Sequence, residues 1–215
     1  MKTCFYYSLF MLIVSCGEGK KAPQTNDENS SSTDSAATAK SKKEDPVLRG
    51  WMNYYLNENP EFKTDKFIKT SSDAINYQST SVKKLNEKGF NEMYKPFLIF
   101  DKSGTRYLDF DSYHWSLAPD GDISFEADQQ VVLVDLPRRT AQQIAFFGPS
   151  FKIEEAYWPD DSTAVLLGNT YEKVPFQMKF NFKNNKMQYF QYPDTLKFKK
   201  SYYENRLQQK LILSR

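Results

Sequence analysis

The sequence predicts an α+β fold that is mainly β: an antiparallel meander sheet, curved or closed like a sandwich or barrel, between an N-terminal and a C-terminal helix. Three observations support this class. From residue 94 onward, short apolar and aromatic runs recur about every ten residues and alternate with turn residues. Helix signals stand on both sides of this region. The 215 residues include 14 tyrosines and 17 phenylalanines but only 8 glycines, a composition that favours half-buried strands.

A helix is predicted at the start of the folded part of the chain. Asp45 is a residue type that caps helices, and Pro46 suits the first helical position. The segment VLRGWMNYYL, residues 47–56, has apolar residues at helical spacing, and an Asn-Pro pair soon after it is typical of a helix end. A second, weaker pattern predicts a helix over TSVKKLNEK, residues 80–88.

The strand region opens with two turn signals. PFLIFD, residues 96–101, and TRYLDFD, residues 105–111, flank the short loop KSG at 102–104, whose glycine supplies the positive φ that a hairpin needs. In APDGD, residues 118–122, proline presets φ, aspartate tolerates turn geometry and glycine takes the left-handed position. Two hairpins are therefore expected here.

Six further strands are predicted: QVVLVDL (130–136), QIAFFG (143–148), FKIEEAYW (151–158), TAVLLGN (163–169), PFQMKFNF (175–182) and KMQYFQY (186–192). The stretch 130–168 is similar to a single β-propeller blade. A complete propeller needs at least about four blades, and the sequence holds no second copy, so a curved sheet, barrel or sandwich is preferred. SYYENRLQQKLIL, residues 201–213, has helical spacing and is predicted to cover a sheet edge.

The N-terminal sixteen residues carry a targeting pattern. Lys2 precedes an apolar run over residues 5–14, which is shorter than the roughly 20 residues of a membrane-spanning helix. The tetrad IVSC, from Ile13 to Cys16, resembles the lipobox of bacterial lipoprotein precursors. The resemblance implies cleavage before Cys16, lipid attachment to its thiol and acylation of the new amino terminus. The alternative is an uncleaved signal anchor with an incidental cysteine.

This resemblance sets the expected domain organisation and location. It implies a signal peptide at 1–15, a lipidated tether at 16–46 and one globular, mainly β domain at 47–215. The tether is almost free of large apolar side chains, which predicts disorder. Glycine rather than aspartate follows Cys16, so the sorting rule for such precursors implies the outer membrane of the cell envelope. In the tether, Asp-Ser-Ala around Ser35 resembles an O-glycosylation motif of some Gram-negative envelope proteins, and Ser35 is the candidate acceptor.

Composition excludes several kinds of chemistry. The two cysteines, Cys4 and Cys16, lie in the predicted leader and at the predicted lipid attachment point. The mature domain therefore has neither a free thiol nor a disulfide. The net charge of +2 gives no reason to expect nucleic acid as a partner. The sequence has no phosphate-binding glycine loop, no nucleophile elbow and no zinc-protease motif, and we expect no cofactor and no metal.

Four side chains are the candidates for acid–base or cation chemistry. His114 is the only histidine, so any histidine-dependent catalysis would need it. Asp109 and Asp111 stand two apart in a predicted strand and project to the same face. With Asp101 across the hairpin, they would form an acid–base pair or a site for a hard cation. If the site is an enzyme centre, all four must converge in one cleft.

Structural alternatives exist for each of these residues. His114 is also explained as a strand residue packed between Tyr113 and Trp115, and this structural explanation is the preferred one. The aspartates are explained by a polar outer sheet face, with Tyr107, Leu108 and Phe110 packing beneath. In the adjacent pairs Glu154-Glu155 and Asp160-Asp161, one member is expected to point outward and the other to cap a turn.

Aromatic side chains offer a binding alternative. A stacking platform for sugars or peptides is predicted from Tyr113, Trp115, Tyr157 and Trp158, although aromatic residues in strands also serve as core and cross-strand pairs. The tract KFKKSYY, residues 197–203, interleaves basic and aromatic residues and is interpreted as the solvated approach to the last helix.

Together these patterns predict a membrane-anchored envelope lipoprotein, more a non-catalytic binding or assembly module than an enzyme. Its expected partners are the membrane, through the lipid, and an envelope protein or glycan. Two alternatives stay open. One is a carboxylate-dependent hydrolase acting on envelope glycans, and the other is a protective or inhibitory lipoprotein that binds a single protein through an exposed aromatic patch.

Overall fold

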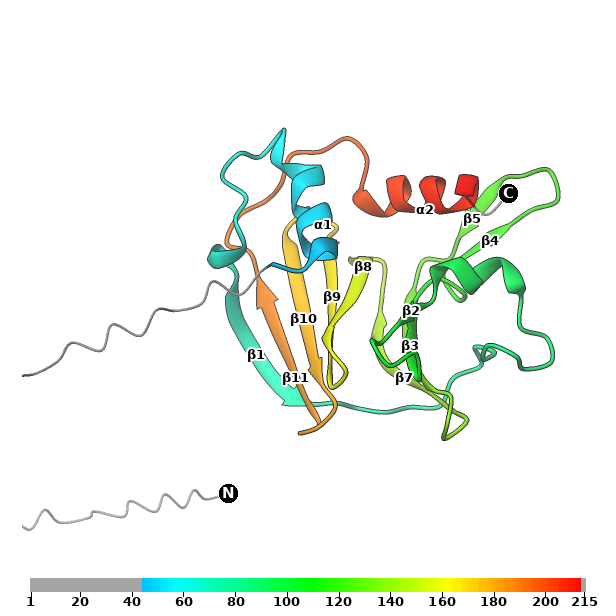
Figure 1. Cartoon of the computed structure of the whole chain (residues 1–215). Helices are drawn as coiled ribbons and strands as arrows, with labels where there is room; N and C mark the ends of the chain where they lie inside the picture. Colours follow the sequence, from blue (N-terminus) through cyan, green and yellow to red (C-terminus); the bar gives the residue numbers. More distant parts are fainter. Residues whose placement is uncertain (1–43, 214–215) are drawn as a thin grey trace, which may run out of the picture. The chain divides into compact units, whose positions relative to one another are not determined.

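The computed structural model describes residues 44–213, which belong to one compact unit (Figure 1). The predicted signal peptide, the lipid attachment at Cys16, the candidate Ser35 and nearly all of the predicted tether lie outside the described residues and remain predictions. Within the described residues strands predominate and form antiparallel sheets, and along the chain all of them lie between helix α1 (Pro46–Leu56) and helix α2 (Tyr202–Leu213). The predicted fold class is confirmed.

Two antiparallel sheets and one separate hairpin make up the β part. The larger sheet has five strands in the order β1-β11-β10-β9-β8, and the smaller sheet has four in the order β2-β3-β6-β7. The strands β4 and β5 pair only with each other. The bounds of the strands are β1 Ile68–Ala74, β2 Ile99–Phe100, β3 Arg106–Asp109, β4 Trp115–Leu117, β5 Ile123–Phe125, β6 Gln129–Asp135, β7 Thr140–Phe147, β8 Phe151–Asp160, β9 Thr163–Thr170, β10 Pro175–Asn181 and β11 Lys186–Gln191. Because β8 to β11 follow one another in both chain and sheet, the larger sheet contains the expected meander.

The main core lies between the two sheets. It contains buried side chains from both, among them Leu108 and Val131 of the smaller sheet and Leu166 and Phe176 of the larger sheet. A second cluster lies on the other face of the larger sheet, and a third on the other face of the smaller sheet. The central strands β6 and β9 are therefore covered on both faces, which explains why they read as nearly continuous apolar runs.

The first helix forms where it is predicted. Helix α1 spans Pro46–Leu56, and the side chain of Asp45 accepts a hydrogen bond from the Val47 amide at 2.9 Å, so the cap is confirmed. The helix buries Trp51 and Tyr55 against the outer face of the larger sheet. Two short 3₁₀ helices, η1 (Thr64–Lys66) and η2 (Glu92–Phe97), follow.

The predicted helix over residues 80–88 is wrong. This segment consists of turns and irregular backbone that cover the outer face of the smaller sheet with Val82 and Leu85. Local side chains satisfy its amides: Thr80 Oγ1 accepts from the Val82 amide, and Glu87 accepts from the Lys84 amide at 3.1 Å. Such short-range bonds compete with helical ones.

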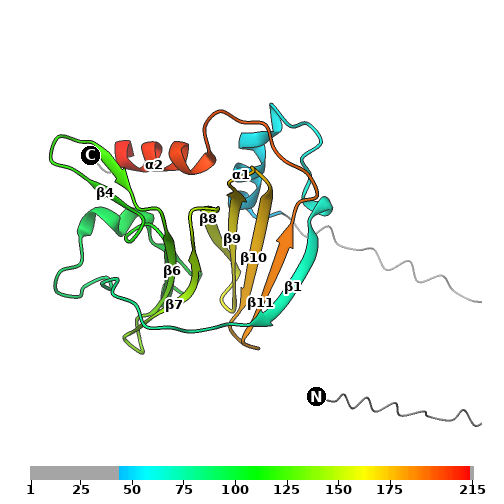
Figure 2. The ribbon, with the colours of Figure 1, turned by 180° about the vertical axis from the view of Figure 1, so that it is seen from behind.

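The last helix closes one end of both sheets. Helix α2, Tyr202–Leu213, lies across the ends of the sheets beside the β4-β5 hairpin, as both Figure 1 and Figure 2 show. Its Tyr203 and Leu207 enter the main core, and it contacts β8, the edge strand of the larger sheet. Ser201 and Glu204 exchange hydrogen bonds at its start in the manner of a capping box.

The stretch that resembles a propeller blade is not a single sheet. Strands β6 and β7 belong to the smaller sheet, whereas β8 and β9 belong to the larger one, because the chain crosses between the sheets at Gly148 and Pro149. The side chain of Gln129 joins the two sheets here. Its Nε2 donates to the carbonyls of Phe110 and Ile153, and its Oε1 accepts from the Ile153 amide at 2.8 Å.

Candidate functional site

Asp101 stabilises the β2-β3 hairpin. The carboxylate accepts hydrogen bonds from the Ser103 hydroxyl, the Thr105 amide and both the amide and Nε of Arg106, at 3.0 to 3.1 Å. Although burial opposes its charge, these donors hold the pKa of Asp101 below its ordinary value. With these four donors bound, the Asp101 side chain stabilises the turn between β2 and β3.

Asp109 is buried and also serves the local backbone. It accepts hydrogen bonds from the amides of Asp111 and Ser112 and from the Ser112 hydroxyl at 2.6 Å. Burial raises the pKa of Asp109 above its ordinary value. The expected polar outer face is therefore wrong for this residue, because the sheet is covered on that side too.

Asp111 is bound to the last helix. Its oxygens lie 2.8 and 2.9 Å from Nη2 of Arg206 and also accept hydrogen bonds from the Tyr203 hydroxyl and the Trp115 indole. Both charged side chains are almost completely buried, with 0% of the Asp111 side chain and 3% of the Arg206 side chain exposed. The guanidinium also lies over the ring of Phe110, 4.7 Å from its centroid. Burial opposes the charge of Arg206, but the adjacent Asp111 carboxylate raises the pKa of the guanidinium.

His114 lies next to this pair but not between the aromatic residues expected. Its ring contacts Phe125 and Tyr203, with centroids 5.7 and 5.4 Å away. Nδ1 lies 3.0 Å from the carbonyl of Asp128, and Nε2 is buried with no hydrogen-bond partner among the described residues. Burial lowers the pKa of His114, which favours the neutral ring.

The four candidates are thus only partly brought together. Three of them, Asp109, Asp111 and His114, lie at the end of the domain near α2. Asp101 lies instead in the β2-β3 hairpin, where it accepts a hydrogen bond from Nε of Arg106. Across residues 44–213, no group of three His, Cys, Asp or Glu side chains is placed to hold a metal ion.

The predicted aromatic platform does not form as one surface. Trp115 and Trp158 are buried in the main core, and Tyr157 lies in the cluster under α1, on the other face of the larger sheet. Tyr113 is half-buried and lies near Phe146. The platform prediction is wrong because adjacent strand residues point to opposite faces, so Tyr157 and Trp158 cannot share one.

A polar site that the sequence analysis did not single out lies around Glu154. This carboxyl is 0% exposed and accepts hydrogen bonds from the Trp51 indole at 2.7 Å, the Tyr55 hydroxyl at 2.8 Å and Nδ2 of Asn169 at 2.8 Å. The Tyr55 hydroxyl in turn accepts from the amide of Tyr202, the first residue of α2. Burial raises the pKa of Glu154, and the neutral donors Trp51, Tyr55 and Asn169 offset this rise only in part.

A β-bulge produces this geometry. The pairing of β8 with β9 shifts register between Ile153 and Glu155, so Glu154 is the extra residue of the bulge. Glu154 and Glu155 are both buried, and the expectation that one of them points outward is wrong. The expected turn cap holds for Asp160, which accepts hydrogen bonds from the amide and the hydroxyl of Ser162.

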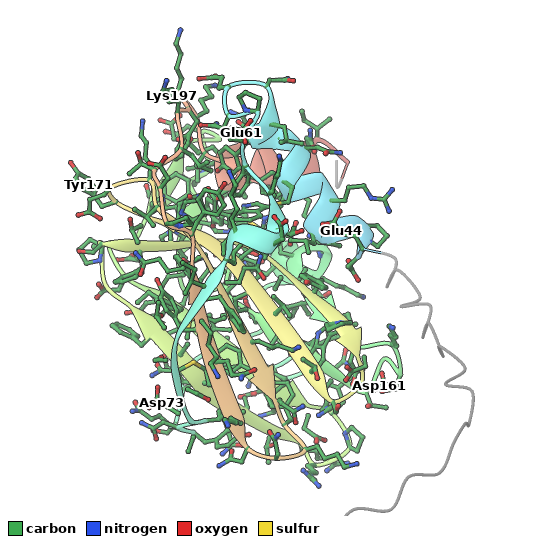
Figure 3. The ribbon with its side chains drawn as sticks, turned by 90° about the vertical axis from the view of Figure 1, so that its left-hand side faces the viewer. Glu44, Glu61, Asp73, Asp161, Tyr171 and Lys197 are labelled. Atoms are coloured by element: carbon green, nitrogen blue, oxygen red, sulfur yellow. The ribbon has the colours of Figure 1, made fainter. Side chains whose placement is uncertain are left out.

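A pocket of 260 Å³ lies against this network. Glu154 and Asn169 belong to its wall, together with residues from the β9-β10 turn and from the loop before α2. In Figure 3, Tyr171 of that turn and Lys197 of that loop lie toward the same end of the domain, and Asp73 lies at the opposite end. The lysines and aromatic residues that line the pocket are Lys152, Lys173, Lys199, Phe151, Tyr171 and Phe198.

Comparison of the chain with protein-family models, curated proteins and solved structures finds no match. Neither helix among residues 44–213 has the length and apolar character to span a membrane.

Proposed function

We propose that this chain is a membrane-anchored lipoprotein of the cell envelope whose globular domain is a non-catalytic binding or assembly module. The anchoring part rests on the lipobox-like tetrad that ends at Cys16. Each buried acyl CH₂ contributes about 0.8 kcal/mol, so attachment of several chains holds the domain firmly at a bilayer. Glycine at the next position favours the outer membrane.

One observation carries the binding part of the proposal. The pocket beside Glu154 combines a buried polar wall with lysines and aromatic side chains, as ligand sites do. By contrast, the carboxylates of Asp101, Asp109 and Asp111 are each engaged by several donors that hold turns or α2 in place. Side chains used in this way support structure rather than proton transfer.

A carboxylate-dependent hydrolase acting on envelope glycans is the second candidate, and one observation favours it. Glu154 has a raised pKa and shares the pocket wall with Glu204, and perturbed carboxyls in pockets are candidate acids. Two facts make it the weaker candidate: Glu154 exposes no surface, and Glu204 is bound to the start of α2. Release of reducing ends from a glycan, lost in the Glu154→Gln variant, would establish the hydrolase instead.

The anchor is tested on the full chain expressed in a bacterial envelope. We expect incorporation of labelled palmitate, recovery with membranes and accumulation of the unprocessed form under globomycin. The Cys16→Ala variant should lose the label and keep its leader, while Cys4→Ala, the matched control, should behave as the unaltered chain does. Equal labelling and equal size of the Cys16→Ala product would contradict the proposal.

A further inference from the structure

Asn169, in the wall of the pocket beside Glu154, has an unpaired buried acceptor. Asn169 is only 4% exposed, and its Nδ2 donates to both Glu154 and the Tyr55 hydroxyl. These two bonds fix the orientation of the amide. Its Oδ1 then has no hydrogen-bond partner among the described residues. A buried acceptor without a donor is unfavourable by about 1 to 3 kcal/mol, and a ligand hydroxyl would supply the missing donor.

The charged residues of the wall favour an anion. Three lysines, Lys152, Lys173 and Lys199, line the pocket with two carboxyls, Glu154 and Glu204. Glu204 already accepts hydrogen bonds from the amide and hydroxyl of Ser201, and Glu154 is fully buried. The lysines are therefore the charged groups that remain available to an incoming molecule.

Two of these lysines are held in position before any ligand arrives. Nζ of Lys173 donates to the carbonyl of Phe198 at 2.9 Å and lies 4.7 Å from the centroid of its ring. Nζ of Lys152 lies 5.5 Å from the rings of both Phe125 and Tyr203. An ammonium has three donors, so these contacts leave donors for a ligand. Holding the side chains in place lowers the entropy lost on binding.

The size and the aromatic residues of the pocket limit the ligand further. A volume of 260 Å³ is just below the range of about 300 to 1,000 Å³ that suits drug-sized molecules, so a single sugar unit is the right scale. Tyr171 is 82% exposed and Phe151 is 37% exposed, so part of each aromatic side chain is accessible to the apolar side of a sugar ring.

From these observations we propose that the pocket beside Glu154 binds an acidic monosaccharide unit, carrying a carboxylate or a phosphate, of an envelope glycan. The anionic group lies toward Lys173 and Lys199, a ring hydroxyl approaches Asn169 Oδ1, and Tyr171 covers the apolar face of the ring. This inference rests on the proposed binding function and names the ligand of its site.

The test measures dissociation constants by ligand-observed NMR with the full chain in detergent. The probes are glucuronic acid and glucose 6-phosphate, with glucose, acetate and inorganic phosphate as comparisons. We expect both acidic sugars to bind more tightly than all three comparisons, and higher salt to weaken their binding. Equal binding of glucose would overturn the anionic part of the proposal, and equal binding of acetate or inorganic phosphate would overturn the sugar part.

Variants on the pocket locate the binding. Lys173→Gln and Lys199→Gln should each raise the dissociation constant by about threefold or more, since each removes one attractive charge. Tyr171→Ala should weaken binding without affecting folding, because the side chain is mostly exposed. The matched control is Lys183→Gln, an exposed lysine in the turn between β10 and β11, which should bind as the unaltered chain does. Unchanged binding in all three pocket variants would place the site elsewhere.

The sugar-binding test and the test of the lipid anchor can fail independently of each other. Cys16→Ala removes the predicted lipid but none of the pocket residues, so it should bind the acidic sugars with the same constants. Failure of palmitate labelling would overturn the anchor and leave the pocket intact, and failure of sugar binding would do the reverse. Cleavage of a glycan by the same samples would replace the binding role with hydrolysis.

Discussion

Two buried carboxyls at the α2 end of the domain are held in opposite ways. Asp111 faces the guanidinium of Arg206, so its charge is matched by a charge. Glu154 is surrounded by the neutral donors of Trp51, Tyr55 and Asn169, so its charge is matched only by dipoles. Both tie α2 to the sheets, through Arg206 in one case and through the amide of Tyr202 in the other.

This difference indicates that Asp111 has a structural role, whereas Glu154 lies at a site that can bind a ligand. In a charge-matched buried pair each charge balances the other, and removing one partner leaves an isolated charge in the interior. Glu154, held by neutral groups, has a raised pKa and lines a pocket together with Asn169, whose amide oxygen is unpaired. We therefore look for function near Glu154 and for stability near Asp111, and the following predictions test this division.

The largest expected effect is at Arg206. Replacing it by methionine leaves the Asp111 carboxylate buried without its counter-charge, and we expect a loss of about 3 to 5 kcal/mol in the free energy of unfolding. Urea unfolding followed by tryptophan fluorescence measures it. Arg138→Met is the matched control, since that side chain is 82% exposed and its ion pair with Asp135 spans 3.7 Å. Exposed pairs contribute about 1 kcal/mol at most.

A double variant checks the cause of this loss. Asp111→Asn combined with Arg206→Met removes both charges, and we expect it to recover a substantial part of the stability lost in Arg206→Met alone. If the double variant is less stable than the unaltered chain by the sum of the two single losses, the two side chains act independently, and the buried pair is not what holds α2.

The next effect is at Tyr55. Its hydroxyl donates to Glu154 and accepts from the Tyr202 amide, so Tyr55→Phe leaves buried groups on both sides without a partner. We expect a loss of about 1 to 3 kcal/mol in the free energy of unfolding. The neighbouring Tyr54→Phe is the control, because that hydroxyl makes only contacts of 3.2 and 3.4 Å to the carbonyls of Lys200 and Ser201. Equal losses in the two variants would show that the hydrogen bonds of Tyr55 in the Glu154 network stabilise the fold no more than the contacts of the Tyr54 hydroxyl do.

The sequence patterns predicted the parts of the fold that depend on local signals. Alternating apolar runs placed β6 to β11, and glycines with φ of 68° and 95° in the structure marked the turns at Gly104 and Gly121. The strand β1 was missed because IKTSSDA is polar and every residue in it is exposed. It becomes a strand only by pairing with the backbone of β11, and this pairing leaves no side-chain pattern from which it could be predicted.

The polar sites were harder to predict because they depend on contacts between distant residues. Asp111 was singled out for its spacing to Asp109, yet its partner Arg206 lies 95 residues further along the chain. For Glu154 and Glu155 the pattern predicts one outward side chain and one turn cap, because a bulge cannot be recognised from two adjacent acidic residues. The pocket combines β8, the β9-β10 turn and the KFKK tract, which alone resembles a solvated loop.

The smallest and most specific effect is the pH dependence contributed by Glu154. Burial raises its pKa in the folded state above the ordinary value of 4.5, so the folded protein binds a proton that the unfolded chain releases. Stability is therefore complete below the ordinary pKa and falls as pH rises through the folded pKa, by about 1.4 kcal/mol for each unit by which the pKa is raised. Asp109 contributes in the same direction, since burial raises its pKa too.

Glu154→Gln isolates this contribution. Glutamine cannot ionise, so the free energy of unfolding should fall less steeply between pH 4.5 and pH 8 than in the unaltered chain, and the difference between the two should shift in favour of the variant as pH rises. Because Asp109 also has a raised pKa, the stability of the variant still falls to some extent as pH rises. Glu172→Gln, which removes an exposed carboxyl outside the Glu154 network, is the control. A parallel profile for Glu154→Gln would mean that the folded protein holds this carboxyl ionised, in which case Glu154 would resemble Asp111 and the contrast between the two sites would disappear.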